Sequence, residues 1–152
     1  HYLHHQPGGA AYANSAELSA RIVAAADQSG IGLTLLPVLY QQGGCDGRAL
    51  TAGQARFGND PDRFARLWQG AAAALRSLPG DAVIGVAPHS LRAVSREGLV
   101  MATDLAPKAP IHLHLAEQLA EVEELKASYG ARPTEWLLAT GPTPTAKPAR
   151  CR

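Results

Sequence analysis

Apolar residues in this chain recur at two spacings, and the two spacings alternate along the sequence. After the N-cap candidates Asn14 and Ser15 they recur at helical spacing, and this run ends at Gly30. Residues 31–40 then form an aliphatic run long enough for one buried strand. The same alternation predicts these further elements: helix 61–78, strand 82–87, a helix from Ser95, strand 110–115, helix 117–129 and a short helix from Pro133.

Strands separated by helices of this length predict parallel pairing through right-handed crossovers, and therefore an α/β fold. The opening residues 1–5, His-Tyr-Leu-His-His, are typical of the end of a preceding strand, which makes about four βα units. A doubly wound sheet and part of a (β/α)₈ barrel both fit this order. No GxGxxG follows any predicted strand, and this weakens the case for a dinucleotide-binding sheet.

Two segments depart from the alternation. Residues 41–58 are rich in glycine and too long for a plain turn, so we expect a binding loop that closes over a ligand. Residues 140–152 have three prolines and no period, which predicts a folded domain over 1–139 followed by a flexible or foreign tail. The chain does not begin with Met, and we expect it to be part of a longer protein.

Composition narrows the class without identifying a partner. The 152 residues are 46% hydrophobic and 18% charged, with a formal net charge of +1, which is ordinary for one soluble globular domain. So weak a charge gives no argument for nucleic acid, and no apolar stretch approaches the roughly 18 residues of a membrane span. We expect a cytoplasmic protein with a small-molecule substrate and with Cys45 and Cys151 unpaired.

Polar residues gather where each predicted strand ends. The sets are Tyr2, His4 and His5 after the first strand, Tyr40, Gln41 and Gln42 after the second, His89, Ser90 and Arg92 after the third, and His114 and Glu117 after the fourth. Any one set has an ordinary explanation as turn or capping chemistry. Because parallel strands end at one edge of a sheet, the four sets together predict a functional site at that edge.

The fourth strand, Ile-His-Leu-His-Leu, carries two histidines on one face. We expect His112 to be a hydrogen-bonded core residue. His114 lies nearer the strand exit, and Glu117 follows in the turn, so an imidazole and a carboxylate could meet there at a metal-bound water. Glu117 has a second interpretation, as an acid stabilised by the dipole of the next helix.

The third strand ends at Pro88, which places His89 at the rim and Arg92 on the following loop. A guanidinium in that position could bind a carboxylate with two hydrogen bonds. An ion-paired or solvated surface arginine is the alternative.

Four segments together resemble the formimidoylglutamate deiminase family of the metal-dependent amidohydrolase superfamily. They are HYLHH at 1–5, LPVLY at 36–40, APHSLRAV at 87–94 and IHLHLAEQ at 111–118. The resemblance covers residues 1–139 and implies a partial (β/α)₈ barrel with one divalent metal, expected to be zinc. It implies that His114 is a metal ligand, that Glu117 is the catalytic proton carrier, and that His89, Arg92 and Tyr2 contact the substrate.

The implied reaction is hydrolysis of N-formimino-L-glutamate to N-formyl-L-glutamate and ammonia, a step of histidine degradation, with a homodimer expected for the full-length form. The family also has an HxH pair after the first barrel strand, a histidine after the sixth and an aspartate after the eighth as ligands, and none of these lies in this sequence. We therefore expect the chain alone to be inactive and to bind metal poorly. Two alternatives are another deaminase or chlorohydrolase of the superfamily, guanine deaminase among them, and a non-catalytic remnant domain.

Overall fold

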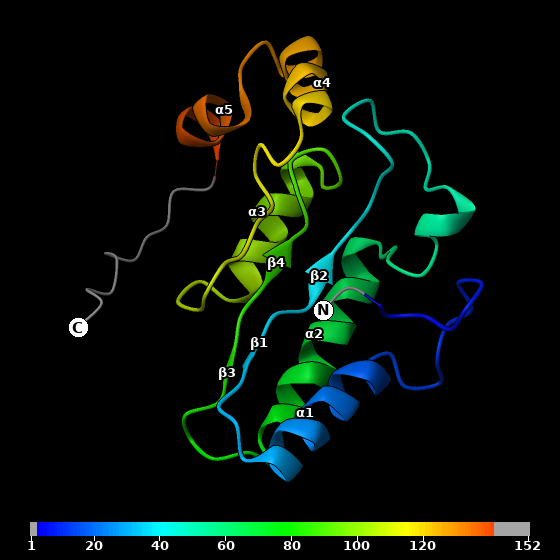
Figure 1. The fold of residues 1–152 in the computed structure, drawn as a ribbon, viewed down its shortest axis with the longest axis vertical. Helices are drawn as coiled ribbons and strands as arrows, with labels where there is room; N and C mark the ends of the chain where they lie inside the picture. The colour runs from blue at the N-terminus through cyan, green and yellow to red at the C-terminus, as the bar shows by residue number, and fades with distance from the viewer. Residues whose placement is uncertain (1–2, 142–152) are drawn as a thin grey trace.

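The computed structural model describes residues 3–141, which form an α/β arrangement of five α-helices and short parallel strands (Figure 1). The helices are α1 (Glu17–Ser29), α2 (Pro61–Leu75), α3 (Arg96–Leu105), α4 (Leu119–Tyr129) and α5 (Pro133–Thr140), with one 3₁₀ turn, η1 (Ala52–Gln54). The strands are β1 (Thr34–Leu35), β2 (Val38–Leu39), β3 (Val83–Ile84) and β4 (Ala87–Pro88). Over the described residues the sheet does not close into a barrel.

The strands β1 and β3 pair in parallel, as do β2 and β4, and the two pairs form one continuous ladder. The N–H groups of Val83, Gly85, Ala87 and His89 donate in turn to the carbonyls of Leu33, Leu35, Pro37 and Leu39, each at 2.9 or 3.0 Å. Residues 33–39 and 83–89 therefore run side by side, which is the pairing that the sequence predicts for its second and third strands.

Pro37 explains why the predicted strand 31–40 appears as two short strands. Proline has no N–H, so it cannot return a hydrogen bond to the carbonyl of Gly85. The indole Nε1 of Trp68, on α2, donates to that carbonyl instead, at 3.0 Å. A helix side chain thus supplies the hydrogen bond to the Gly85 carbonyl that the strand backbone cannot supply.

The predicted strand 110–115 is in place but much reduced. It joins the sheet through two isolated parallel bridges, Val86 with Ile111 and Ser90 with His114. The N–H of His112 donates to the carbonyl of Val86, and the N–H of His114 donates to the carbonyl of His89. Between these two bonds, one strand advances by two residues and its neighbour by three, which is a bulge. Pro88 lies in this bulge and has no N–H to give the neighbouring strand.

Local capping places most helix starts where the sequence predicts them. Asp60 Oδ1 accepts the N–H of Arg63 at 2.8 Å, and Ser95 Oγ accepts that of Gly98 at 3.0 Å. Gly30 ends α1 in the left-handed conformation, with φ 69°. The predicted start of helix 117–129 is wrong, because α4 begins at Leu119 and leaves Glu117 in the preceding loop.

One face of the strands packs against the helices. Leu39 and Val86 share a core cluster with Phe64 and Leu67 of α2 and with Leu125 of α4, and all five side chains are at most 1% exposed. A second cluster joins α1, β1 and α2 through Val23, Leu35, Ala71 and Leu75. Because side chains alternate along a strand, the opposite face is left for other contacts.

The first predicted strand is not seen in the described residues. Residues 3–5 take part in β-pairing only through an isolated antiparallel bridge, from His5 to Ala11. The described sheet therefore has three strand segments, residues 33–39, 83–89 and 111–114, and not the four predicted. Tyr2 and residues 142–152 lie outside the described residues. Within residues 3–141, no helix is both long and apolar enough to cross a membrane.

Candidate active-site rim

Four aromatic side chains meet where the strand segments end, and we call Tyr40, His89, His112 and His114 the rim cluster. The ring centroids of His89 and His114 lie 4.9 Å apart, and those of Tyr40 and His89 lie 4.6 Å apart. His112 and His114 are 5.6 Å apart. Three strand segments, distant in sequence, thus bring their exit residues together, as the sequence predicts for a parallel sheet. In Figure 1 these segments run toward the end of the molecule where α4 lies.

Three residues of the rim cluster, His89, His112 and His114, line a cleft of about 380 Å³ between the strands and Ile22 of α1. The other residues that line it come from the first two strand segments: Leu33, Thr34, Leu35, Leu36, Val38, Ala87 and Pro88. His112 and His114 share a face, as the spacing predicts. The expectation that His112 is a buried core residue is wrong: its side chain is exposed, because this face of its strand borders the open cleft.

His89 is half-buried in the middle of the cluster. Its backbone N–H donates to Leu39, and its Nδ1 shares a hydrogen bond of 3.2 Å with Ser90 Oγ. The pKa of His89 is lowered to about 4, mainly by burial and to a smaller extent by the charges of His114 and Arg92, while the carboxylate of Glu117 opposes the shift. At neutral pH His89 is therefore an uncharged imidazole, able to give or accept a hydrogen bond or to bind a metal.

Arg92 follows His89 on a turn that is fixed to the second strand exit. The backbone N–H groups of Gln41 and Gln42 both donate to the carbonyl of Ala93, and Gln42 Nε2 donates to that of Arg92 at 3.3 Å. The Arg92 side chain is half-buried and forms none of the ion pairs found in the described residues. The turn therefore holds an unpaired guanidinium close enough to His89 to affect its pKa.

Glu117 lies in the loop between His114 and α4. Its side chain is exposed, and its backbone N–H donates to Glu121 Oε2 at 3.0 Å. Its negative charge raises the pKa of His89, so the carboxylate lies near enough to that imidazole to influence it. No hydrogen bond in the described residues joins the carboxylate to His89 or His114, so a meeting of these groups stays a prediction.

Sequence reasoning missed the two contacts that fasten α4 to its surroundings. One is the bond from Glu117 to Glu121, whose only signal is a glutamate in the first turn of the helix. The other involves Glu124, whose Oε1 accepts the N–H of Cys45 and pairs with Arg48 Nη1, both at 3.0 Å. This second contact ties the glycine-rich loop 41–58 to α4, and nothing in the local sequence indicates it.

The described residues do not form a metal site by themselves. Over residues 3–141 there is no group of three or more His, Cys, Asp or Glu side chains placed to hold an ion. The rim cluster offers imidazole nitrogens, which suit zinc, but a zinc site needs three or four ligands. The donors present therefore fit one part of such a site.

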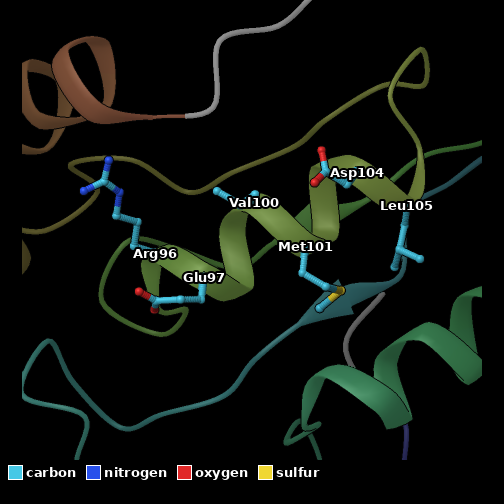
Figure 2. Close-up of a pocket in the computed structure, with 6 residues that line it drawn as sticks. All are labelled: Arg96, Glu97, Val100, Met101, Asp104 and Leu105. Carbon is cyan, nitrogen blue, oxygen red and sulfur yellow. The ribbon is translucent and has the colours of Figure 1, made fainter.

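A larger groove lies elsewhere on the molecule and contains none of the predicted site residues. It runs along α3, has a volume of about 610 Å³ and is lined by Arg96, Glu97, Val100, Met101, Asp104 and Leu105 (Figure 2). Its lining has no histidine. The chemistry that the sequence predicts belongs to the smaller cleft.

The fold matches solved amidohydrolase and deaminase structures. An amidohydrolase from Brucella melitensis aligns with a TM-score of 0.89 and 54% sequence identity, over 92% of this chain and 31% of that chain. An adenosine deaminase from Xanthomonas campestris with bound zinc aligns with a TM-score of 0.62 and 22% identity, over 80% of this chain and 26% of that one. The arrangement of strands and helices is thus that of a segment of the amidohydrolase fold. No protein-family model matches the chain.

The resemblance to formimidoylglutamate deiminase is confirmed. The chain is 44% identical to the enzyme of that name from Pseudomonas aeruginosa over 140 residues, which are 90% of this chain and 30% of that protein. The chain therefore spans about a third of the length of the proteins it matches.

Proposed function

We propose that this chain is one arc of the (β/α)₈ barrel of a metal-dependent deiminase. Its substrate would be N-formimino-L-glutamate, hydrolysed at the formimino C=N bond to N-formyl-L-glutamate and ammonia. Residues 33–39, 83–89 and 111–114 would be three neighbouring barrel strands, because they pair in parallel and in chain order. By "complete enzyme" we mean this chain together with the strands and ligands that it does not supply.

The observation that carries the proposal is the packing of His89 against His114, with ring centroids 4.9 Å apart at the exits of neighbouring strands. Active sites of such barrels form at this face, from residues at the ends of several strands. The 44% identity to a formimidoylglutamate deiminase supports this choice of reaction.

We infer that His114 would be this segment's contribution to the metal site. Its ring is on the cleft face, beside a neutral His89. Zinc is the expected metal, and the remaining ligands would come from the rest of the barrel. A divalent metal in such a site would act as a Lewis acid and activate water for attack.

Glu117 would move the proton. Two observations support this role: Glu117 is exposed, and its charge raises the pKa of His89. A carboxylate there can take a proton from the attacking water and deliver it to the departing nitrogen, which leaves as ammonia. The Glu117 side chain is exposed in this chain. In the complete enzyme, the substrate and the opposite side of the barrel would cover it.

Arg92 would hold the far end of the substrate. Its guanidinium is near the cluster and has no carboxylate partner in the described residues, so a glutamyl carboxylate could take that place. Binding a carboxylate there would orient the formimino carbon toward His114 and Glu117. A deaminase acting on a neutral purine or triazine would have no use for this charge.

The setting of the enzyme follows from the resemblance and not from the cleft. We propose a cytoplasmic enzyme that acts on a small molecule, without nucleic acid or membrane, and a homodimer in its full-length form. Tyr2 remains a proposed substrate contact.

The test is ammonia release from N-formimino-L-glutamate by the zinc-loaded complete enzyme. We expect saturable release that Glu117→Gln lowers by about 10³-fold and that Glu123→Gln, an exposed change on the following helix α4, leaves unaltered. Absence of release from the unmodified enzyme, or full activity of the Glu117→Gln variant, would overturn the proposal.

A further inference from the structure

The carboxylate of Glu121 is buried against the loop that carries Glu117. Glu121 is 7% exposed, although glutamate side chains are rarely buried without a partner. Its Oε2 accepts the backbone N–H of Glu117 at 3.0 Å. The bond holds the main chain of Glu117 and leaves its side chain out of the contact.

This contact is a capping interaction displaced by one residue. In an ordinary capping box, the glutamate at the third helical position accepts the N–H of the N-cap residue. Here the N-cap is Gln118, whose side chain makes no capping bond, and Glu121 at the third position reaches one residue further back. The displacement moves the anchor onto Glu117 itself.

The loop between His114 and Glu117 needs such an anchor. Ala116 has φ 55°, the one positive φ of a non-glycine residue within residues 3–141. A side chain with a Cβ disfavours this conformation, which persists only where surrounding contacts hold it. The bond to Glu121 follows the strained residue directly, so it fixes the direction in which Glu117 leaves the loop.

We propose that Glu121 is a positioning residue: through the N–H of Glu117 it aims the Glu117 carboxylate at the rim cluster. The inference rests on the function proposed above, because it assigns Glu121 a part in placing the proton carrier. Glu121 itself touches neither His89 nor His114 by any hydrogen bond in the described residues.

The first experiment measures the contact in this chain directly. Hydrogen exchange of the Glu117 amide is followed by NMR in Glu121→Ala, Glu121→Gln and the matched control Glu123→Ala, whose side chain is 60% exposed. In Glu121→Ala we expect exchange of the Glu117 amide to accelerate at least about tenfold, with the Leu125 amide changed by less than about twofold. An unchanged rate at Glu117 would overturn the proposal.

The Glu121→Gln variant tests the bond even if Glu121→Ala unfolds α4. Its amide oxygen can still accept the bond, but without the charge, so we expect the Glu117 N–H resonance to move upfield while α4 stays folded. A resonance that does not move would contradict the bond.

The second experiment separates positioning from structure in the complete enzyme. Glu121→Ala should lower kcat about 30-fold with KM within about twofold, Glu121→Gln should recover most of the loss, and Glu123→Ala should match the unmodified enzyme. If Glu117→Gln is inactive while Glu121→Ala keeps full kcat, the positioning role is wrong and the proposed function stands. If Glu117→Gln is fully active, the proposed function itself is wrong.

Discussion

The body of the chain, residues 17–106, and the rim segment, residues 111–141, are built differently. In the body, α1, α2 and α3 cover one face of the ladder, and Phe64 and Leu39 are fully buried. The rim segment joins the sheet by two single bridges, and Leu119 and Leu138 are 77% and 84% exposed. Figure 1 shows α4 and α5 at one end of the molecule and α1 at the other.

This difference separates stability from chemistry. Core burial is the main source of folding free energy, so the body should determine whether the chain folds. The residues with a proposed chemical role lie at the boundary, His89 and Arg92 on the body and His114 and Glu117 on the rim segment. Functional groups on a loosely packed segment need specific anchors, which Leu125 provides in the core and Glu121 at the loop.

The largest expected effect is on the rim side. Glu117→Gln in the complete enzyme should lower kcat by about 10³-fold, within the range for loss of a general acid-base group, because an amide cannot carry the proton. The midpoint of urea unfolding should stay the same. Steady-state kinetics and unfolding curves of the same preparation check both points, and a shifted midpoint would show that Glu117 belongs to the packed structure.

A substitution in the body should do the reverse. Phe64→Ala should lower the free energy of unfolding of this chain by about 3–5 kcal/mol, because it opens a cavity in a fully buried site. The matched change Leu138→Ala, on the rim segment, should alter it by less than about 0.5 kcal/mol. Urea titrations of both variants make the comparison, and equal losses would contradict the division into body and rim.

Acid should weaken the chain through His4. Burial lowers the pKa of His4 to about 4, against the partial opposition of its hydrogen bond to the carbonyl of Val38. The unfolded chain, with a pKa near 6.5, binds more protons between these values, so stability is full above pH 6.5 and falls as the pH drops toward 4.

The variant His4→Gln isolates this contribution from that of His89. Between pH 7 and pH 5 it should lose about 2 kcal/mol less stability than the unmodified chain. Urea unfolding at the two pH values measures the difference, and identical losses in both proteins would remove His4 as the cause.

The smallest effect concerns the sheet beside Pro37. Trp68→Phe keeps most of the packing but removes the indole donor, leaving the carbonyl of Gly85 without it. We expect a loss of about 1–2 kcal/mol in the free energy of unfolding, the cost of an unsatisfied buried acceptor. A double change that also replaces Pro37 by Ala should recover part of this, since residue 37 would then offer its own N–H, and no recovery would rule out the exchange of donors.

The helix starts could be predicted from neighbouring residues, whereas the breaks in the strands depend on contacts between residues that are distant in sequence. Asp60 and Ser95 cap the helices that follow them, so a few neighbouring residues determine both starts. Pro37 and Pro88 interrupt the ladder through their missing N–H groups, and Trp68, distant in sequence, replaces one of them. No pattern along the strand reveals that exchange of donors.

The site was predictable to a similar extent. The alternation of side chains correctly placed His112 and His114 on one face, and the parallel order brought His89 beside them. The burial of His112 was wrong, because exposure depends on what covers the cleft and not on the strand itself. The contact of Glu121 with the Glu117 N–H could not be predicted, because it depends on the loop in which Ala116 has a positive φ.

The proposed metal site is tested by anomalous X-ray diffraction at the zinc edge from crystals of the zinc-loaded complete enzyme. We predict one zinc ion bonded to an imidazole nitrogen of His114, with the Glu117 carboxylate and the His89 ring on the same side of the sheet. A zinc ion bound without His114, or a Glu117 carboxylate on the opposite side of the sheet, would contradict it.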